Sequence, residues 1–334
     1  FFYGRYNMRK ILLTTTALVG LGGISAASAL DISGSYEFTY SNSDDGVVDT
    51  GGNNTTSFGN DARVQFSGSQ TSDAGLTFSG LYAINHNAAV EDMGLTVSGD
   101  FGTVMAGATD GRVDVSDNFF NFATYVETGH GTSNSTMLNG GAAMSDNATT
   151  GKIGYSSPNI SGFQVHLSME DPGTASKADN FATLITYTTG GLGIGFGTME
   201  SPEAGGTGAD TSQTNWGFGY TYGDINVRYS IGTDITAGTN GGADTSKVST
   251  IDYGAHYGGI ENVGLYVSVV SSEEKLAASS NTGDKMDSTA VGLEYSVAPG
   301  VSLLLEQTAS DYADATAGGT NNDSLDTTFV GLSV

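Results

Sequence analysis

The chain has 334 residues, no cysteine, 11 basic and 36 acidic residues, and a formal net charge of −25. Such an acidic chain is not expected to bind nucleic acid, because binding phosphates requires a basic surface. The lack of cysteine excludes disulfides and thiolate metal sites. A mean hydropathy of −0.12 is ordinary for a soluble protein. Transmembrane β-barrels also have ordinary averages, because lipid-facing apolar residues alternate with polar ones.

Residues 8–29 have the features of a secretory signal peptide. A basic start is followed by an apolar stretch and by the small residues Ala27-Ser28-Ala29 at the expected cleavage site. We expect the mature protein to start at Leu30, and we assign no role to residues 1–7. The mature chain then has 8 basic residues against 36 acidic ones, a formal charge of −28.

From Leu30 onward, the chain is a succession of segments of about ten residues in which apolar and polar residues alternate, as in half-buried β-strands. In the clearest case, residues 215–230, aromatic and aliphatic residues take one side and small or polar residues the other. Sixteen such segments are predicted, at 30–42, 57–69, 75–87, 91–99, 101–108, 150–157, 162–170, 181–189, 191–199, 213–222, 224–233, 248–258, 262–272, 286–297, 300–309 and 326–334.

Short turns and longer polar loops alternate between these segments. Gly99-Asp100 and Gly223-Asp224 are examples of the short turns, and only the second of the longer connections, around Asn87 to Val90, is brief. An even number of strands with short turns at one rim is the layout of an outer-membrane barrel. The sequence therefore predicts an all-β fold, a closed antiparallel transmembrane barrel of sixteen strands over residues 30–334. A soluble β-sandwich or a surface-layer protein would not require this alternation.

The connection at residues 109–150 has no strand alternation. Loops longer than about 12–15 residues without regular structure are usually functional or disordered, and aromatic residues argue against disorder. The aromatic cluster of this third long loop is Phe119, Phe120, Phe122 and Tyr125. We expect the loop to fold into the barrel, with this cluster as its anchor, and to narrow the pore.

The run LTVSGDFGTVMAG at 95–107 is similar to the hairpin of the fourth and fifth strands in general porins of Gram-negative bacteria. Together with the signal peptide and the segment GKIGYSSPNISGF at 151–163, it resembles the porins of alphaproteobacteria such as Rhodobacter. The resemblance implies an outer-membrane homotrimer that contacts lipid and lipopolysaccharide and passes ions and small hydrophilic solutes. The family commonly has an arginine soon after this hairpin's glycine, where this chain has Ala108 and then Arg112.

Charged side chains on the strands are expected to face the lumen, because Arg or Lys on the lipid face costs up to about 2–4 kcal/mol. Arg63, Lys152 and Arg228 are out of phase with their apolar neighbours and are our candidates for the wall of a constriction. The facing candidates on the third long loop are Asp110, Arg112, Asp114, Asp117 and Glu127. Opposed charges would order water and disfavour apolar solutes, and the acidic composition predicts weak cation selectivity. For each residue, the alternative is a solvated charge away from the narrowest point.

No catalytic residues, metal site or redox cofactor are predicted. The four histidines lack metal-ligand spacing, and the glycine run at 191–197 is interpreted as a strand because no helix follows it to bind phosphate. Acidic loop segments such as Asp44-Asp45 and Asn321 to Asp323 could hold Ca²⁺, although solvated surface charge is the favoured interpretation. Two alternatives to a general diffusion channel remain: a substrate-selective channel, and an acidic surface-layer or adhesin-like structural protein.

Overall fold

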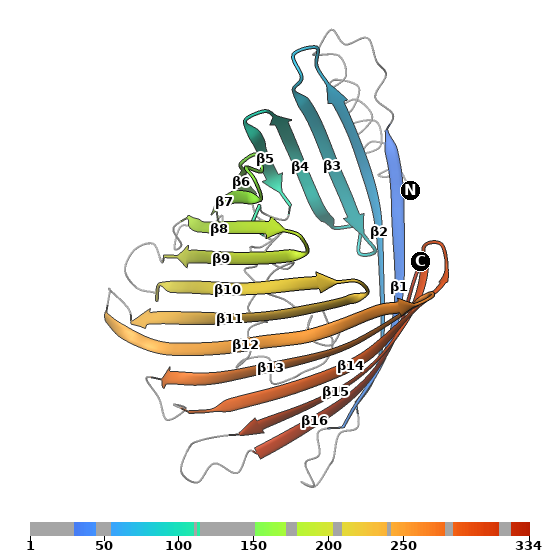
Figure 1. Cartoon of the computed structure of the whole chain (residues 1–334), viewed down its shortest axis with the longest axis vertical. Helices are drawn as coiled ribbons and strands as arrows, with labels where there is room; N and C mark the ends of the chain where they lie inside the picture. The colour runs from blue at the N-terminus through green and yellow to red at the C-terminus, as the bar shows by residue number, and fades with distance from the viewer. Residues whose placement is uncertain are drawn as a thin grey trace, which may run out of the picture.

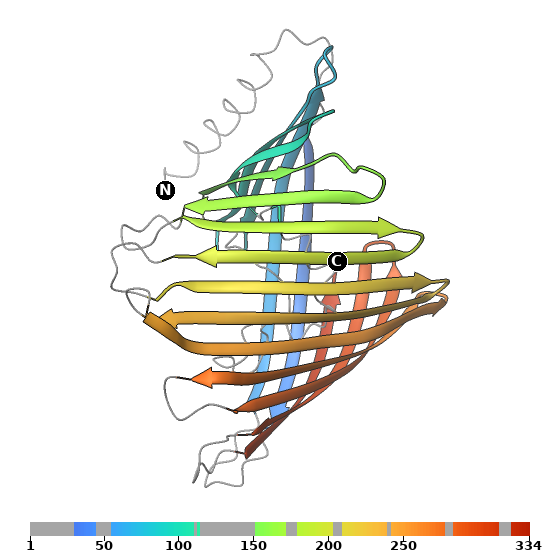
Figure 2. The same ribbon diagram turned by 60° about the vertical axis from the view of Figure 1, so that its left-hand side comes forward.

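The computed structural model describes residues 30–44, 55–109, 112–113, 151–171, 179–202, 209–238, 242–277, 283–313 and 322–334. These residues form sixteen strands in one closed antiparallel barrel, in which each strand pairs with its sequence neighbours and β1 pairs with β16. Figures 1 and 2 show the chain running once around the barrel until the first and last strands lie side by side. The predicted fold is confirmed. The predicted signal peptide at 8–29, and residues 1–7, lie outside the described residues.

In chain order the strands are β1 Asp31–Asp44, β2 Thr55–Thr71, β3 Thr77–Asn85, β4 Val90–Gly99, β5 Gly102–Ala108, β6 Gly151–Ser156, β7 Phe163–Asp171, β8 Asn180–Thr189, β9 Leu192–Ser201, β10 Thr211–Tyr222, β11 Ile225–Gly238, β12 Gly242–Ile260, β13 Val263–Ala277, β14 Lys285–Ala298, β15 Val301–Ala313 and β16 Asn322–Ser333. Each overlaps one predicted segment. Several strands extend further toward the long loops than predicted, and the largest difference is in β12. Its first residues, GADTSK, are polar on both faces and therefore carry no alternation signal. In the described part of the chain, no helix is long and apolar enough to cross a membrane.

The polarity of the barrel wall is inverted relative to that of a soluble protein. Large apolar side chains lie exposed on the outer face, for example Phe58 at 69% and Ile153 at 55% exposure. Polar and charged side chains are buried on the inner face, among them Glu170 and Ser268. Soluble proteins rarely expose large contiguous apolar surfaces. The outer face is therefore suited to lipid and the inner face to water or to other polar groups.

Neighbouring hairpins are joined by hydrogen bonds at the rim that carries the short turns. Four successive turns each accept a backbone hydrogen bond from the first strand of the next hairpin. The donor and acceptor residues are Thr188 to Gly162, Thr221 to Gly191, Gly258 to Asp224 and Ser296 to Asn262, each with an N to O distance of 2.9 Å. The rim is therefore held together by contacts between hairpins as well as within them.

Candidate functional site on the inner wall

Lys152 and Glu170 form an oppositely charged pair on the inner wall. They are cross-strand partners on β6 and β7, and each is only 4% exposed. Ile153, the next residue on β6, points outward, as the strand alternation requires. Opposite charges on directly opposed strand residues attract each other. A buried lysine in this position is therefore electrostatically compatible with its surroundings.

Arg63, on β2, lies beside two consecutive acidic residues at the start of β4. Its Nη2 donates to Asp92 Oδ2, and its Nε lies 3.4 Å from Glu91 Oε2. Successive strand residues normally point to opposite faces. Here the register shifts, because Ile84 pairs with Val90 while the preceding Ala83 pairs with Asp92. This bulge leaves Glu91 without a direct partner in the strand register and allows both carboxylates to approach the same guanidinium.

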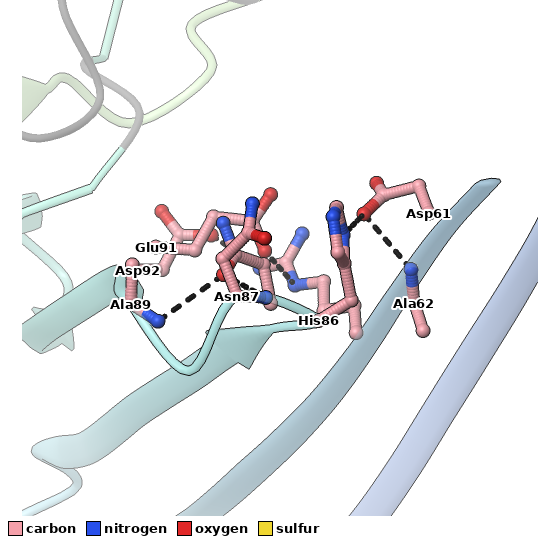
Figure 3. Close-up of polar contacts among 9 residues, drawn as sticks. Asp61, Ala62, His86, Asn87, Ala89, Glu91 and Asp92 are labelled. Carbon is pink, nitrogen blue, oxygen red and sulfur yellow. Dashed lines mark hydrogen bonds and ion pairs between the residues drawn. The ribbon is translucent and has the colours of Figure 1, made fainter. Parts of the chain in front are cut away.

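The brief second loop beside this cluster is held by hydrogen bonds of its own (Figure 3). The side-chain oxygen of Asn85 accepts hydrogen bonds from the backbone N–H groups of Asn87 at 3.1 Å and Ala89 at 3.2 Å. His86 Nδ1 lies 3.0 Å from Asp61 Oδ1 on β2. The loop is thereby tied both to itself and to the neighbouring strand, directly before the two acids that lie beside Arg63.

Arg112 lies against the inner wall just after β5. Its Nη2 donates to Thr96 Oγ1 on β4 at 3.4 Å, and its stem passes over Gly154 on β6. A Cβ on Gly154 would lie only 2.6 Å from Arg112 Cγ and 3.3 Å from Met105 Cε. Burial lowers the pKa of the Arg112 guanidinium, but arginine is so strongly basic that the group keeps its positive charge in proteins. Arg112 thus places a positive charge on the inner wall. The adjacent Val113 is fully buried.

The three predicted wall cations lie on three separate strands of the barrel, β2, β6 and β11. Arg228 is only four residues beyond the short turn Gly223-Asp224. The other predicted loop residues lie outside the described residues: Asp110, Asp114, Asp117, Glu127, Phe119, Phe120, Phe122 and Tyr125. The predicted opposition of wall and loop charges therefore remains a prediction.

Sequence reasoning missed the acidic partners of Arg63. Asp92 lies on the strand face opposite to that of the exposed residues Met93 and Leu95, and the same alternation identified the wall cations. Applying this criterion to acidic residues would have identified Asp92 as facing the lumen. It would not have found Glu91, because the bulge that turns this residue cannot be recognised from the alternation.

Two aromatic side chains on the inner face do not form a surface for solutes. Tyr266 and Phe329 are 8% and 1% exposed and cluster with the buried Leu304. The Tyr266 hydroxyl donates to Glu306 Oε2, and Thr308 Oγ1 donates to the other carboxylate oxygen at 3.2 Å. The described residues contain no group of three or more His, Cys, Asp or Glu side chains that could hold a metal ion. Asp45 and Asn321, from the predicted calcium segments, lie outside the described residues.

Comparisons with known proteins agree with this architecture. The sequence model of the Gram-negative porin family matches residues 14–332. No curated protein sequence matches the chain significantly. Among solved structures, the anion-selective porin from Comamonas acidovorans has a TM-score of 0.70 at 15% identity, covering 92% of this chain and 99% of that one.

Two further structures have the same fold. The trimer form of in-vitro folded OmpT, an outer-membrane protein of Vibrio cholerae, has a TM-score of 0.64 at 14% identity, covering 92% of this chain and 100% of its own. A mutant form of the porin from Rh. blastica has a TM-score of 0.56 at 15% identity, covering 91% and 100% respectively. At these identities the structural similarity concerns the fold.

Proposed function

Because the chain belongs to the Gram-negative porin family, we propose that it forms a water-filled outer-membrane channel for passive diffusion of ions and small hydrophilic solutes. The observation that carries the proposal is the inverted polarity of the closed barrel, with exposed apolar side chains outside and buried polar ones inside. Such a channel requires no catalytic step. Conductance steps after adding purified protein to a planar lipid bilayer would support the proposal, and purified, folded protein that gives none would contradict it.

We further propose that the third long loop narrows the lumen and that three copies assemble side by side in the membrane. The contact of Arg112 with Thr96 on the inner wall and the burial of the adjacent Val113 support an inward path for the loop. The trimer form of the similar OmpT supports the assembly. Cross-linking in native outer membranes would test it, with a limiting product of three copies expected.

Deleting residues 117–125 is expected to raise the single-channel conductance in KCl. The deletion removes the aromatic cluster that we propose as the anchor of the loop, so the loop should no longer narrow the lumen. The measurement is single-channel recording of the deletion variant beside the wild type, after both are shown to be folded. Unchanged conductance would mean that this segment lies outside the narrowest part of the pore.

The channel is expected to select weakly for cations. A mature formal charge of −28 concentrates cations within a Debye length of about 8 Å at physiological ionic strength. The similar porin from Comamonas acidovorans is described as anion-selective, so selectivity has to be measured for each chain. Under a tenfold KCl gradient, the reversal potential should have the sign of K⁺ preference, and the preference should weaken as salt is raised. A Cl⁻ preference would contradict the prediction.

A further inference from the structure

The long-loop half of β2 is an open sheet edge. β2 pairs with β1 along residues 55–67, but it pairs with β3 only along residues 63–71. Among the described residues, none pairs with residues 55–62 on the side of β3. Beyond the end of β3, β2 therefore continues with only β1 beside it (Figure 1). Residues 56–58, 60 and 61 of this segment are exposed.

The brief connection between β3 and β4 does not cover this edge. It consists of residues 86–89, which Asn85 holds in place by two hydrogen bonds, and His86 contacts β2 only at Asp61 (Figure 3). The open edge is eight residues long, about 26 Å at the usual rise of about 3.3 Å per strand residue. Four residues that leave β3 and return to β4 cannot also extend along this length.

The backbone groups of alternate residues on this edge point away from β1. Tyr36 and Val334 exchange both of their backbone hydrogen bonds, with N to O distances of 3.0 and 2.9 Å, so the even-numbered residues of β1 bond to β16. Bonded and non-bonded pairs alternate along antiparallel strands. The partner of an even-numbered β1 residue, such as Asn60, therefore directs its N–H and C=O to the open side. Ala62, at an equivalent position, donates its N–H to Asp61 Oδ1 at 2.8 Å.

The open edge begins at the depth of the lipid-facing surface. Phe58 is 69% exposed, and its ring centroid lies 6.1 Å from that of Phe38 and 5.3 Å from that of Tyr40 on β1. Aromatic residues gather at the membrane interfaces of outer-membrane barrels, so this cluster marks the interface on the long-loop side. Asn60 lies between it and the outward apolar Val64. Unpaired backbone groups at this depth would face hydrocarbon, which membrane proteins do not tolerate.

Another protein segment can satisfy such an edge, because extended segments add to open strands through backbone hydrogen bonds. We propose that a segment of a neighbouring copy of this chain lies along β2 from Thr56 to Ala62 and pairs with its backbone. A second copy suits this position because its own outer face is apolar and lies at the same depth in the membrane. The inference rests on the proposed side-by-side assembly and deepens it, because it places the contact between copies at the open edge of β2.

Photochemical cross-linking from position 60 identifies what covers the edge. The chain has no cysteine, so Asn60→Cys can carry a single benzophenone label there. Irradiation of the labelled protein in outer membranes should give a product with the mass of two chains. Thr289→Cys is the matched control, because Thr289 is also an exposed, outward residue, on β14, and it should give lipid adducts only. Lipid adducts alone, or cross-links within one chain, from position 60 would overturn the proposal.

A proline at position 60 tests the backbone pairing itself. Asn60→Pro removes an N–H that does not bond to β1, and the preceding Gly59 has no Cβ to clash with the ring. The barrel should still fold, but the dissociation constant of the assembly in detergent, measured by ultracentrifugation, should rise about tenfold for the lost hydrogen bond.

Asn60→Ala is the control for the proline variant, because it keeps the N–H, and it should leave the dissociation constant close to that of the wild type. Equal constants for Asn60→Pro and Asn60→Ala would contradict backbone pairing at this edge. Failure of the assembly proposal is distinguishable, because the wild type would then give no multi-chain product with a general cross-linker. A wild type that gives such products, together with lipid adducts alone at position 60, would refute the β2 contact and leave the assembly standing.

Discussion

Replacing Gly102 with alanine is expected to destabilise the barrel by at least about 3 kcal/mol, the sum of backbone strain and steric overlap. Gly102 begins β5 with a φ of +104°, a conformation that residues with a Cβ rarely adopt. The added methyl group would overlap the backbone oxygen of Ser156 and lie 3.0 Å from the carbonyl carbon of Ser157. Both belong to backbone that is already paired or turning, so neither atom can move away without breaking contacts.

Gly75→Ala is the matched control for this prediction. Gly75 also has a positive φ, +81°, but a Cβ there would meet no atom within 4 Å. It should therefore suffer the backbone strain alone and lose less stability than Gly102→Ala. Urea unfolding in detergent micelles can be followed by the fluorescence of the single tryptophan, Trp216, which lies on the outer face. Equal losses in the two variants would show that contact with Ser156 is not the cause.

Replacing Gly154 with valine is expected to dislodge Arg112 from the inner wall. The new side chain would occupy the space now filled by the arginine stem, and such overpacking typically costs about 1–3 kcal/mol. The loss should be largely relieved in the double variant with Arg112→Ala, which empties that space. Urea unfolding of the wild type, both single variants and the double variant gives the coupling energy. A coupling near zero would mean that Gly154 and Arg112 do not compete for space.

Single-channel recording of the same variants tests the functional consequence. If Arg112 contributes a cation to the lumen, Arg112→Ala and Gly154→Val should shift the reversal potential in the same direction, because both remove that cation from its position. Gly151→Val is a control in the same strand, at an outward position where a Cβ meets no atom within 4 Å. It should leave both stability and selectivity close to those of the wild type.

The barrel could be predicted from the sequence because every membrane-spanning strand must present apolar residues to lipid. The requirement produces the same period-2 pattern in each strand, as in Trp216, Phe218 and Tyr220 of β10. Where strands extend beyond the lipid, as at the start of β12, both faces are polar and the pattern is lost. Several strands, β12 above all, therefore extend further toward the long-loop rim than the alternation predicts.

The inner wall could be predicted only in part. The position of a residue in the alternation of its strand indicates which side of the wall it occupies. This alternation places Lys152 on the inner face, where it is buried. Partners depend on register between strands, so the contact of Arg63 with Asp92, 29 residues away and next to a bulge, had no local signal. The contact of Arg112 with the inner wall also had no local sequence signal, because the third long loop lacks any periodicity. Height along the pore is set by strand tilt and stagger, which the alternation of a single strand does not encode.

The hydrogen bonds between successive short turns also restrict how this protein can change over evolutionary time. Inserting a residue into one of these turns would displace the carbonyl oxygen that the next hairpin binds, for example that of Gly162 or Gly191. A change in one turn would therefore require compensation in its neighbour. Changes in length are accordingly expected to be rare at the short-turn rim, so this framework of linked turns stays fixed.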